Sequence, residues 1–408
     1  MKAVEVCVGA GGMTLGLHAA GFETVWAAEM DKHACNTFRR AFPDVELFEG
    51  KLTGEEEWLE RFAGVELLAG GVPCQPFSTA GKGRGQFDSR DGFPMFLRLM
   101  ERLRPRVALI ENVKGLTSKT HEEYLKAVVD AMEALGYTVP HGTRTKGTGP
   151  GQVLDAADFG VPQRRHRLFL VAFRETEDAA RFSWPEPTHS KEALEYAQLG
   201  DGSYWKRYGL YHTTNIHNAR PCPRGRMPWR TVMDALVEKF EGVRVPVGRI
   251  PFIKAVKAAN GVKFPDDVNA PCRILDAQQG SGDARVSEVF VDVEQLSPKA
   301  IDYLERDPRH LKKHPPARGD KPSPTQTSDN HRGVPYGLVN KGDICDDSPG
   351  YHLRRLTPRE CARIQDFPDS HFFEGPKTAQ YRQIGNAVPP KLAEAVGRAI
   401  ARAIGDGR

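Results

Sequence analysis

The stretch AVEVCVGAGGMT, residues 3–14, decides the fold class of this chain. Residues 3–8 are mostly apolar and predict a buried strand, and Gly9, Gly11 and Gly12 follow them directly. Glycines at this place let the chain turn tightly and bring its backbone close to a ligand at a helix N-terminus. The third glycine of the dinucleotide pattern would fall at position 14, where the sequence has Thr14. The loop therefore indicates a nucleotide-like cofactor and counts against NAD.

Four more short apolar runs predict strands at residues 24–28, 67–69, 107–110 and 168–173. Helical patterns lie between them, and the clearest ends at Gly136, which can supply a left-handed C-cap. The apolar face of that helix carries Tyr124, Leu125, Val128, Val129, Met132 and Leu135. Alternating strands and helices are typical of parallel βαβ units. We therefore expect an α/β fold with an open doubly wound sheet, whose ligands bind beyond the carboxyl ends of the strands.

Length and composition exclude several classes of protein. A chain of 408 residues is too long for one compact core, so we expect two lobes. The net charge of +4 permits a polyanionic partner without requiring one. Seven cysteines without a Cys-x-x-Cys pair argue against a disulfide framework and a zinc site. No run approaches the roughly 20 apolar residues that cross a bilayer. We expect a soluble, cytoplasmic protein without a metal or a membrane segment.

Reactive residue types follow several predicted strands. The run GGVPCQPFS at residues 70–78 places Cys74 between two prolines. A lone cysteine is more often a buried small hydrophobe, but a thiol in a rigid loop beyond a strand favours a nucleophile. Glu111 follows another strand, where a carboxylate could cap a helix instead. Its place in the same crevice as Cys74 favours catalysis. Glu29 ends the second strand, at the separation from the glycines at which an acid reaches ribose hydroxyls.

Five ordered blocks of sequence together resemble the cytosine-5 DNA methyltransferase family, of the type found in bacterial or phage restriction-modification systems. They are PCQ at residues 73–75, ENV at 111–113, QRRHR at 163–167, RRLTPRECAR at 354–363 and YRQIGNAVPP at 381–390. These blocks frame nearly the whole chain and leave residues 185–351 without a strong family motif. The resemblance implies a Rossmann-like S-adenosylmethionine-dependent methyltransferase sheet with an inserted smaller target-recognition domain.

The resemblance also implies a mechanism, because carbon 5 of cytosine is too weak a nucleophile to take a sulfonium methyl group unaided. The thiolate of Cys74 would add to carbon 6 of a cytosine flipped out of duplex DNA. Glu111 would act as an acid at N3 and the exocyclic amine. Arg165 would hold the base oxygen and keep the thiol ionised, and Arg167 would support that geometry.

For the cofactor, the resemblance implies S-adenosylmethionine. The binding residues that it implies are Gly9, Gly11, Gly12, Glu29, Met30, Leu52, Asn386 and Ala387. Two positions depart from the family. Cys7 stands where the family often has a phenylalanine against the adenine, and Lys51 stands where it often has an acid that contacts the adenine amine. A lysine cannot accept that hydrogen bond. Either the backbone near Leu52 makes the contact or the alignment slips by several residues.

The expected domains are a catalytic domain at residues 1–185, a target-recognition domain at 186–379 and a C-terminal segment at 380–408. That segment contains a helix predicted at residues 390–404, which should pack on the first lobe. Its apolar face carries Leu392, Ala393, Val396, Ala399 and Ile400. Residues 204–230 contain no acid and mix basic with aromatic side chains, which suits phosphate contacts but equally a solvated loop. A second basic and polar stretch lies between residues 306 and 333.

The implied partner is double-stranded DNA, with the loop at residues 79–90 closing over the flipped base. We expect a monomer associated with the nucleoid and leave open a functional pairing with a restriction endonuclease. Alternatives are a tRNA methyltransferase of the same family, a catalytically silent DNA-binding relative, and an NAD-dependent enzyme. The long insert counts against tRNA, and intact Cys74, Glu111 and Arg165 count against a silent relative.

Overall fold

The computed structural model describes nine stretches of the chain. They are residues 1–73, 91–143, 147–207, 224–231, 234–235, 272–273, 289–292, 351–354 and 357–405. The chain divides into two compact units. The first comprises Met1–Phe159, Arg165–Pro187 and Ser370–Arg408, and the second comprises Gly160–Arg164 and Thr188–Asp369.

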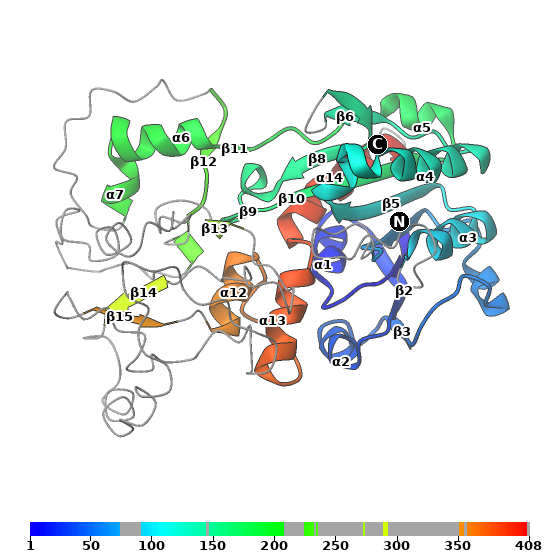
Figure 1. Cartoon of the computed structure of the whole chain (residues 1–408), viewed down its shortest axis with the longest axis horizontal. Helices are drawn as coiled ribbons and strands as arrows, with labels where there is room; N and C mark the ends of the chain where they lie inside the picture. Colours follow the sequence, from blue (N-terminus) through cyan, green and yellow to red (C-terminus); the bar gives the residue numbers. More distant parts are fainter. Residues whose placement is uncertain are drawn as a thin grey trace. The chain divides into compact units, whose positions relative to one another are not determined.

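The first unit contains a seven-stranded sheet in the order β3-β2-β1-β4-β5-β10-β8 (Figure 1). Its strands are β1 (Lys2–Val6), β2 (Glu23–Glu29), β3 (Glu46–Glu49), β4 (Leu67–Gly70), β5 (Val107–Val113), β8 (Gln152–Asp155) and β10 (His166–Phe173). The first five strands pair in parallel, whereas β10 runs antiparallel to both β5 and β8. The predicted α/β class is confirmed, and the sheet is mixed, so the expectation of parallel units does not extend to β10.

Helices flank this sheet, and two of them match predicted patterns. The α-helices are α1 (Gly12–Ala19), α2 (Lys32–Ala41), α3 (Phe93–Leu103), α4 (Glu122–Ala134), α5 (Thr176–Arg181), α13 (Lys377–Asn386) and α14 (Pro390–Ile404). The unit also contains η1 (Glu57–Phe62), η4 (Lys114–Thr117), η5 (Lys119–His121), η6 (Ala156–Phe159) and a hairpin of β6 (His141–Thr143) with β7 (Thr148–Pro150). Helix α4 buries the predicted Leu125, Val128, Val129 and Met132, and Gly136 follows it with φ of 90°.

Helix α14 packs closely on α1, because each helix presents a glycine to the other. A Cβ on Gly16 would lie 2.3 Å from the carbonyl oxygen of Pro390, and a Cβ on Gly397 would lie 2.8 Å from Cβ of Ala20. Since both sets of contacts advance together along the two helices, α1 and α14 run parallel. Their N-termini therefore lie at the same end of this helix pair.

A buried polar network joins β1, β2 and α1 near the start of the chain. Glu5 accepts hydrogen bonds from the hydroxyl groups of Thr14 and Thr24, and its side chain has almost no exposed surface. Nε2 of His18 lies 3.0 Å from the same Thr24 hydroxyl. Burial raises the pKa of Glu5 from 4.5 to about 7, although both hydroxyl groups act to lower it. The carboxyl therefore titrates near neutral pH.

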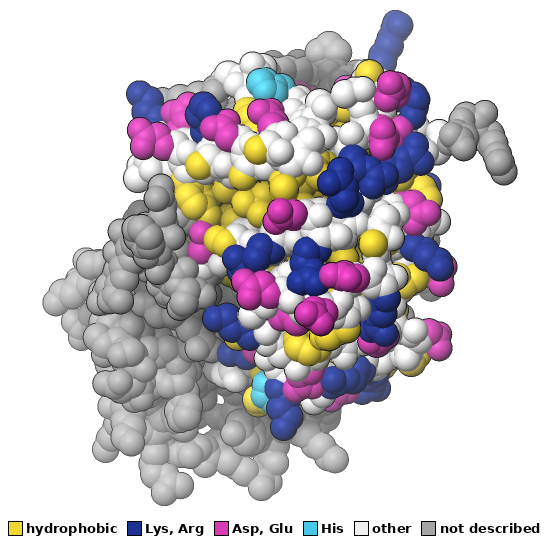
Figure 2. Space-filling model, turned by 90° about the vertical axis from the view of Figure 1, so that its right-hand side faces the viewer, with side chains coloured by type: hydrophobic (Ala, Val, Ile, Leu, Met, Phe, Trp, Pro, Cys, Tyr) yellow, Lys and Arg dark blue, Asp and Glu magenta, His cyan; other side chains and the backbone are white. Residues whose placement is uncertain are grey.

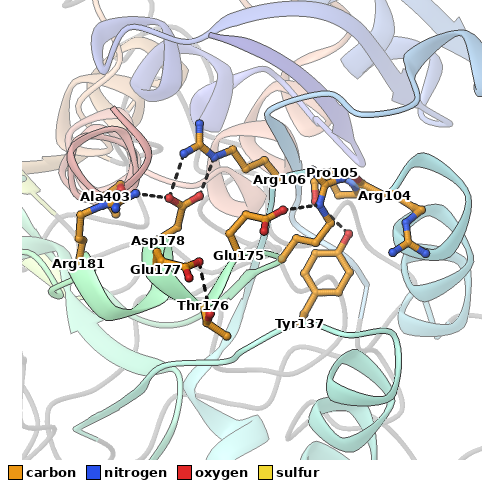
Figure 3. Close-up of polar contacts among 11 residues, drawn as sticks. Arg104, Pro105, Arg106, Tyr137, Glu175, Thr176, Glu177, Asp178, Arg181 and Ala403 are labelled. Carbon is orange, nitrogen blue, oxygen red and sulfur yellow. Dashed lines mark hydrogen bonds and ion pairs between the residues drawn. The ribbon is translucent and has the colours of Figure 1, made fainter. Parts of the chain in front are cut away.

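At the amino end of β5, an ion-pair network ties α5 and α14 to the sheet (Figure 3). Asp178 is 1% exposed and accepts from both Nε and Nη2 of Arg106, at 2.6 and 2.9 Å. It also pairs with Arg181, whose Nε donates to the carbonyl oxygen of Ala403 at 2.9 Å. Two cations and several hydrogen bonds thus compensate the burial of one carboxylate.

Acidic and basic side chains are interspersed on the face of the molecule shown in Figure 2. Ion pairs such as Arg102 with Glu60, at 2.8 Å, and Arg61 with Glu46 lie on the surface of the first unit. Such exposed pairs add little to stability, typically up to about 1 kcal/mol each. The described residues on this face do not form one continuous positive surface.

The second unit is described by short elements. They are β9 (Gln163–Arg164), β11 (His189–Ser190), α6 (Lys191–Glu195), the π-helix η7 (Tyr196–Gly200), α7 (Ser203–Arg207), β12 (Met227–Pro228), β13 (Cys272–Arg273), β14 (Val289–Asp292), β15 (Tyr351–Arg354) and α12 (Pro358–Ile364). Thr357 caps α12 in a capping box with Glu360. Residues 208–223 and the whole stretch from 306 to 333 lie outside the described residues.

Candidate active site

The glycine loop after β1 adopts backbone conformations that favour glycine. Gly9 and Gly11 have φ of 55° and 82°, and Gly12 begins α1. A Cβ on Gly11 would lie 2.3 Å from the ring of Phe42, so this position excludes a side chain on two grounds. Among the described residues, a Cβ on Gly9 would meet no atom within 4 Å. These residues therefore leave open space beside the loop at the carboxyl end of β1.

Glu29, at the end of β2, binds the loop directly. One carboxylate oxygen accepts the N–H of Gly9 at 2.8 Å, and the other accepts the N–H groups of Met30 and Asp31 at 2.7 and 2.8 Å. The predicted acid and the predicted glycines thus lie together, although they are 20 residues apart in sequence. Oε2, which accepts only the N–H of Gly9 among the described residues, retains a lone pair for a further donor, such as a ribose hydroxyl.

The remaining predicted cofactor contacts near β2 and β3 differ from one another in exposure. Met30 is 66% exposed, whereas the side chain of Leu52 is buried in the core. Leu52 could therefore contact a ligand only through its backbone. Lys51 is exposed and follows the end of β3 by two residues, so it stands at the carboxyl edge of the sheet.

Two cysteines lie beside Glu29 and are poor nucleophiles. Burial, followed by the charge of Glu29, raises the pKa of Cys7 and of Cys35 to about 12. Sγ of Cys35 also donates to the carbonyl oxygen of Glu29 at 3.4 Å. At neutral pH both thiols are protonated, which removes them as candidates for covalent catalysis.

Glu111 and Arg167 form a buried ion pair on neighbouring strands. Nε of Arg167 lies 2.8 Å from Oε1 of Glu111, and both side chains are 10% exposed. The antiparallel register sets this pair, because Arg167 on β10 lies opposite Val113 on β5 and Phe169 lies opposite Glu111. The second carboxylate oxygen, Oε2, lies 3.3 Å from the position that a Cβ on Gly71 would take. Glu111 therefore faces the segment that leads to Cys74.

Cys74 itself lies outside the described residues, but the three residues before it are described. Asn112, which is buried beside Glu111, donates from Nδ2 to the carbonyl oxygen of Val72 at 3.2 Å. The end of β5 thus holds the chain two residues before Cys74. The loop at residues 79–90, predicted to close over the base, also lies outside the described residues.

Arg165 occupies a different place from Arg167. It is 1% exposed, and its Nη2 donates to the carbonyl oxygen of Gly385 at 2.8 Å. Its backbone N–H donates to Oδ1 of Asp155 at 2.9 Å. Since Gly385 immediately precedes the predicted cofactor residues Asn386 and Ala387, Arg165 links the arginine block to the last block of the chain.

Asn386 ends α13 and Ala387 follows it, directly before α14. Because α14 runs parallel to α1, these residues lie at the same end of the helix pair as the glycine loop. Predicted cofactor residues from both ends of the chain therefore lie toward the same end of the helix pair.

Contacts between α2 and the last block were not predicted. Asp31 caps α2 and accepts from Nη2 of Arg382 at 2.6 Å. Thr37 donates to Oε1 of Gln383 at 2.6 Å and accepts the N–H of Glu374 at 2.8 Å. The only sequence signal for these roles was the position of Arg382 and Gln383 inside the YRQIGNAVPP block.

The described residues contain no group of three or more His, Cys, Asp or Glu side chains arranged to hold a metal ion. Among them, no helix is long and apolar enough to cross a membrane.

Comparisons with known proteins agree with this geometry. The family model for C-5 cytosine-specific DNA methylase matches residues 1–402. The Type II methyltransferase M.NgoMIV of Neisseria gonorrhoeae is 32% identical over 401 residues, covering 98% of this chain and 97% of that protein. The Type II methyltransferase M.Eco47II of Escherichia coli is 30% identical over 404 residues, covering 97% of this chain and 78% of that protein.

A solved structure shows the same fold. The DNMT2 mutant of Spodoptera frugiperda aligns with a TM-score of 0.55 at 15% identity, covering 98% of this chain and 99% of that one. At this identity the likeness concerns the fold alone.

Proposed function

The chain belongs to the C-5 cytosine-specific DNA methylase family, and on that basis we propose how its own residues methylate DNA. It is accordingly a DNA (cytosine-5) methyltransferase whose methyl donor is S-adenosylmethionine. The observation that carries the proposal is the buried pair of Glu111 and Arg167, in which the second carboxylate oxygen of Glu111 faces the segment leading to Cys74.

The residues at the sheet edge suit the methyl donor. Space beside Gly9 gives a nucleoside room to approach the backbone, and Oε2 of Glu29 offers an acceptor for a ribose hydroxyl. Met30, Asn386, Ala387 and the backbone of Leu52 complete the proposed binding site. When bound, S-adenosylmethionine supplies an electrophilic methyl group on a sulfonium sulfur. Because Cys7 replaces an aromatic residue, we propose that exposed Met30 provides the apolar contact for the adenine.

The reaction begins with the thiol of Cys74 in its thiolate form. The thiolate forms a bond to carbon 6 of the cytosine, and the electron pair of the C5–C6 double bond moves into the ring. Glu111, in its protonated form, donates a hydrogen bond to N3 and accepts one from the exocyclic amine, and its proton offsets the negative charge that accumulates in the ring. Carbon 5 then takes the methyl group, and the sulfonium sulfur of the donor would leave as a neutral thioether. A solvent water takes the carbon-5 proton, which restores the double bond as the C6–S bond breaks and releases Cys74 as thiolate.

The two arginines divide their roles by position. We propose that Arg167 holds Glu111 in orientation and contacts the base oxygen, because it is the arginine that lies beside the acid. Arg165 supports the cofactor residues through Gly385. This division reverses the one that the sequence resemblance implied for the pair. The guanidinium of Arg167 also offers its remaining N–H donors to a carbonyl of the base.

For the whole protein, we propose that residues 1–185 with 380–408 catalyse methyl transfer and that residues 186–379 read the DNA sequence. The relatives named above are Type II methyltransferases, which supports pairing with a restriction endonuclease. We further propose that the protein is a cytoplasmic monomer that associates with the nucleoid through its DNA substrate.

The test is methyl transfer from labelled S-adenosylmethionine to duplex DNA and, in parallel, to tRNA. The native protein is compared with Cys74→Ala, and the modified cytosines are mapped by bisulfite sequencing. Label on duplex cytosine that disappears with Cys74→Ala supports the proposal and identifies the target sequence. Label on tRNA alone, or on DNA with the Cys74→Ala protein, would contradict it.

A further inference from the structure

The two ends of the segment that carries Cys74 are held together by Pro73 and Gly92. The N–H of Gly92 donates to the carbonyl oxygen of Pro73 at 2.9 Å. A Cβ on Gly92 would lie 2.7 Å from Cδ of Pro73 and 3.2 Å from its nitrogen. Gly92 has φ of −88°, which any residue can adopt. The nearness of Pro73, and not the backbone conformation, therefore requires a glycine here.

Asp91, which precedes Gly92, connects the contact between Pro73 and Gly92 to two helices. Its Oδ1 accepts the N–H of Phe93 at 3.1 Å, at the start of α3. Its Oδ2 accepts the hydroxyl of Tyr124, which lies on α4. The rings of Phe93 and Tyr124 meet edge to face, with centroids 5.7 Å apart. The position of Gly92, and through it Pro73, is thus set by packed helices.

We propose that Asp91, Gly92 and Tyr124 form a collar that positions Cys74 for attack on the base. The proposal rests on the function proposed above, in which Cys74 is the nucleophile. All three are positioning residues, since they act through Pro73, which is bonded to Cys74. Bringing the two ends of a loop together costs chain entropy. The contact between Pro73 and Gly92 fixes the two ends without involving the reacting thiol. A nucleophile displaced by about 1 Å can lose on the order of a hundredfold in rate.

Positioning of Cys74 by these residues and simple stabilisation of the fold predict different effects of a substitution. Loss of a hydrogen bond that only stabilises the fold would lower the midpoint of unfolding and leave kcat unchanged in the folded enzyme. Loss of a hydrogen bond that positions Cys74 lowers kcat, because the geometry of attack changes. Either loss leaves the KM for S-adenosylmethionine unchanged, because Glu29 and the glycine loop lie on other elements.

The chain offers a matched control for Tyr124. Tyr137 donates from its hydroxyl to the carbonyl oxygen of Pro105 at 2.9 Å, at the amino end of β5 and away from Glu111 (Figure 3). Burial raises the pKa of Tyr137 to about 12. The substitutions Tyr124→Phe and Tyr137→Phe therefore each remove one tyrosine hydroxyl that makes a hydrogen bond, at opposite ends of the same sheet.

The experiment measures kcat and KM for methyl transfer to duplex DNA, with thermal unfolding of each protein as a check of folding. We expect Tyr124→Phe to lower kcat about tenfold with the KM for S-adenosylmethionine unchanged within about twofold, because the variant loses a hydrogen bond to the charged Asp91. Tyr137→Phe should leave both constants near native values. The stronger variant Gly92→Ala, which displaces Pro73, should lower kcat about a hundredfold.

The Cys74→Ala protein separates the two proposals. If it retains activity, the proposed function fails. If it is inactive while folded Tyr124→Phe and Gly92→Ala match native kcat, the nucleophile stands and the collar is overturned. A fall in kcat that Tyr137→Phe reproduces equally would also overturn the collar, because the effect would then follow general stability.

Discussion

Arg167 holds Glu111 from the neighbouring strand, with 2.8 Å between Nε and Oε1 and both side chains nine-tenths buried. A buried charge pair of this kind is costly to break, because removing one partner leaves the other charge without compensation. The pair therefore links the catalytic chemistry of the site to the stability of the sheet.

Replacing Arg167 with methionine should lower both activity and stability. We expect kcat to fall at least about a hundredfold, as for loss of a charge-stabilising group, and the free energy of unfolding to fall by about 3 kcal/mol. Adding Glu111→Gln to this variant should restore much of the stability without restoring activity. Urea unfolding and methyl-transfer assays measure the two effects. Native stability and kcat in Arg167→Met would contradict the role given to this pair.

Replacing Arg165 with methionine should act mainly on the cofactor. Arg165 binds the carbonyl oxygen of Gly385, next to Asn386, so its loss should raise the Kd for S-adenosylmethionine by about tenfold, the size of one charged hydrogen bond. Isothermal titration of the Arg165→Met and Arg167→Met proteins makes the comparison. An equal or larger rise in Kd with Arg167→Met would count against the division of roles.

The close packing of α1 on α14 predicts a graded response to added methyl groups. A Cβ on Gly16 would lie within 2.6 Å of backbone atoms of Pro390 and Glu394, which cannot yield easily. A Cβ on Gly397 would meet mainly Cβ of Ala20, at 2.8 Å. Overpacking costs about 1–3 kcal/mol, so we expect Gly16→Ala near the upper end and Gly397→Ala near the lower end. Chemical denaturation provides the values, and the reverse order would refute the packing.

The buried carboxyl of Glu5 predicts a pH dependence of stability. Its pKa is about 7 in the folded protein against 4.5 for an ordinary glutamate, so the folded state binds a proton more tightly than the unfolded state. Its contribution to the free energy of unfolding is therefore complete below pH 4.5. That contribution, about 3 kcal/mol in total, is lost as pH rises through about 7. The Glu5→Gln protein should lack this loss and be more stable than native at pH 8. If the free energy of unfolding of the native and Glu5→Gln proteins changed equally with pH across this range, the role given to Glu5 would be excluded.

Local features of the fold followed from the sequence, and long-range features did not. The five predicted strands, the buried face of α4 and the packing face of α14 are all local patterns of apolar residues. Strand β3, of sequence ELFE, lacks an apolar run because it is the edge of the sheet, and it was not predicted. The antiparallel direction of β10 was missed because an apolar run does not encode strand direction.

The candidate site shows the same limit. Residue types in the PCQ, ENV and QRRHR blocks indicated the chemistry, but which arginine lies beside Glu111 depends on the register of β10 against β5. The contact of Arg165 with Gly385 joins residues 220 positions apart, and that of Thr37 with Gln383 joins residues 346 positions apart. No local sequence pattern predicts contacts between residues so far apart.

The most direct test of the central claim is to trap the covalent intermediate. Duplex DNA carrying 5-fluorocytosine at the mapped target is incubated with the protein and S-adenosylmethionine, and the cross-linked peptide is identified by mass spectrometry. Because fluorine at carbon 5 cannot leave as a proton does, the account predicts a stable adduct on Cys74 alone, with none formed by Cys74→Ala. An adduct on another residue, or turnover of the normal target without any trapped adduct, would contradict it.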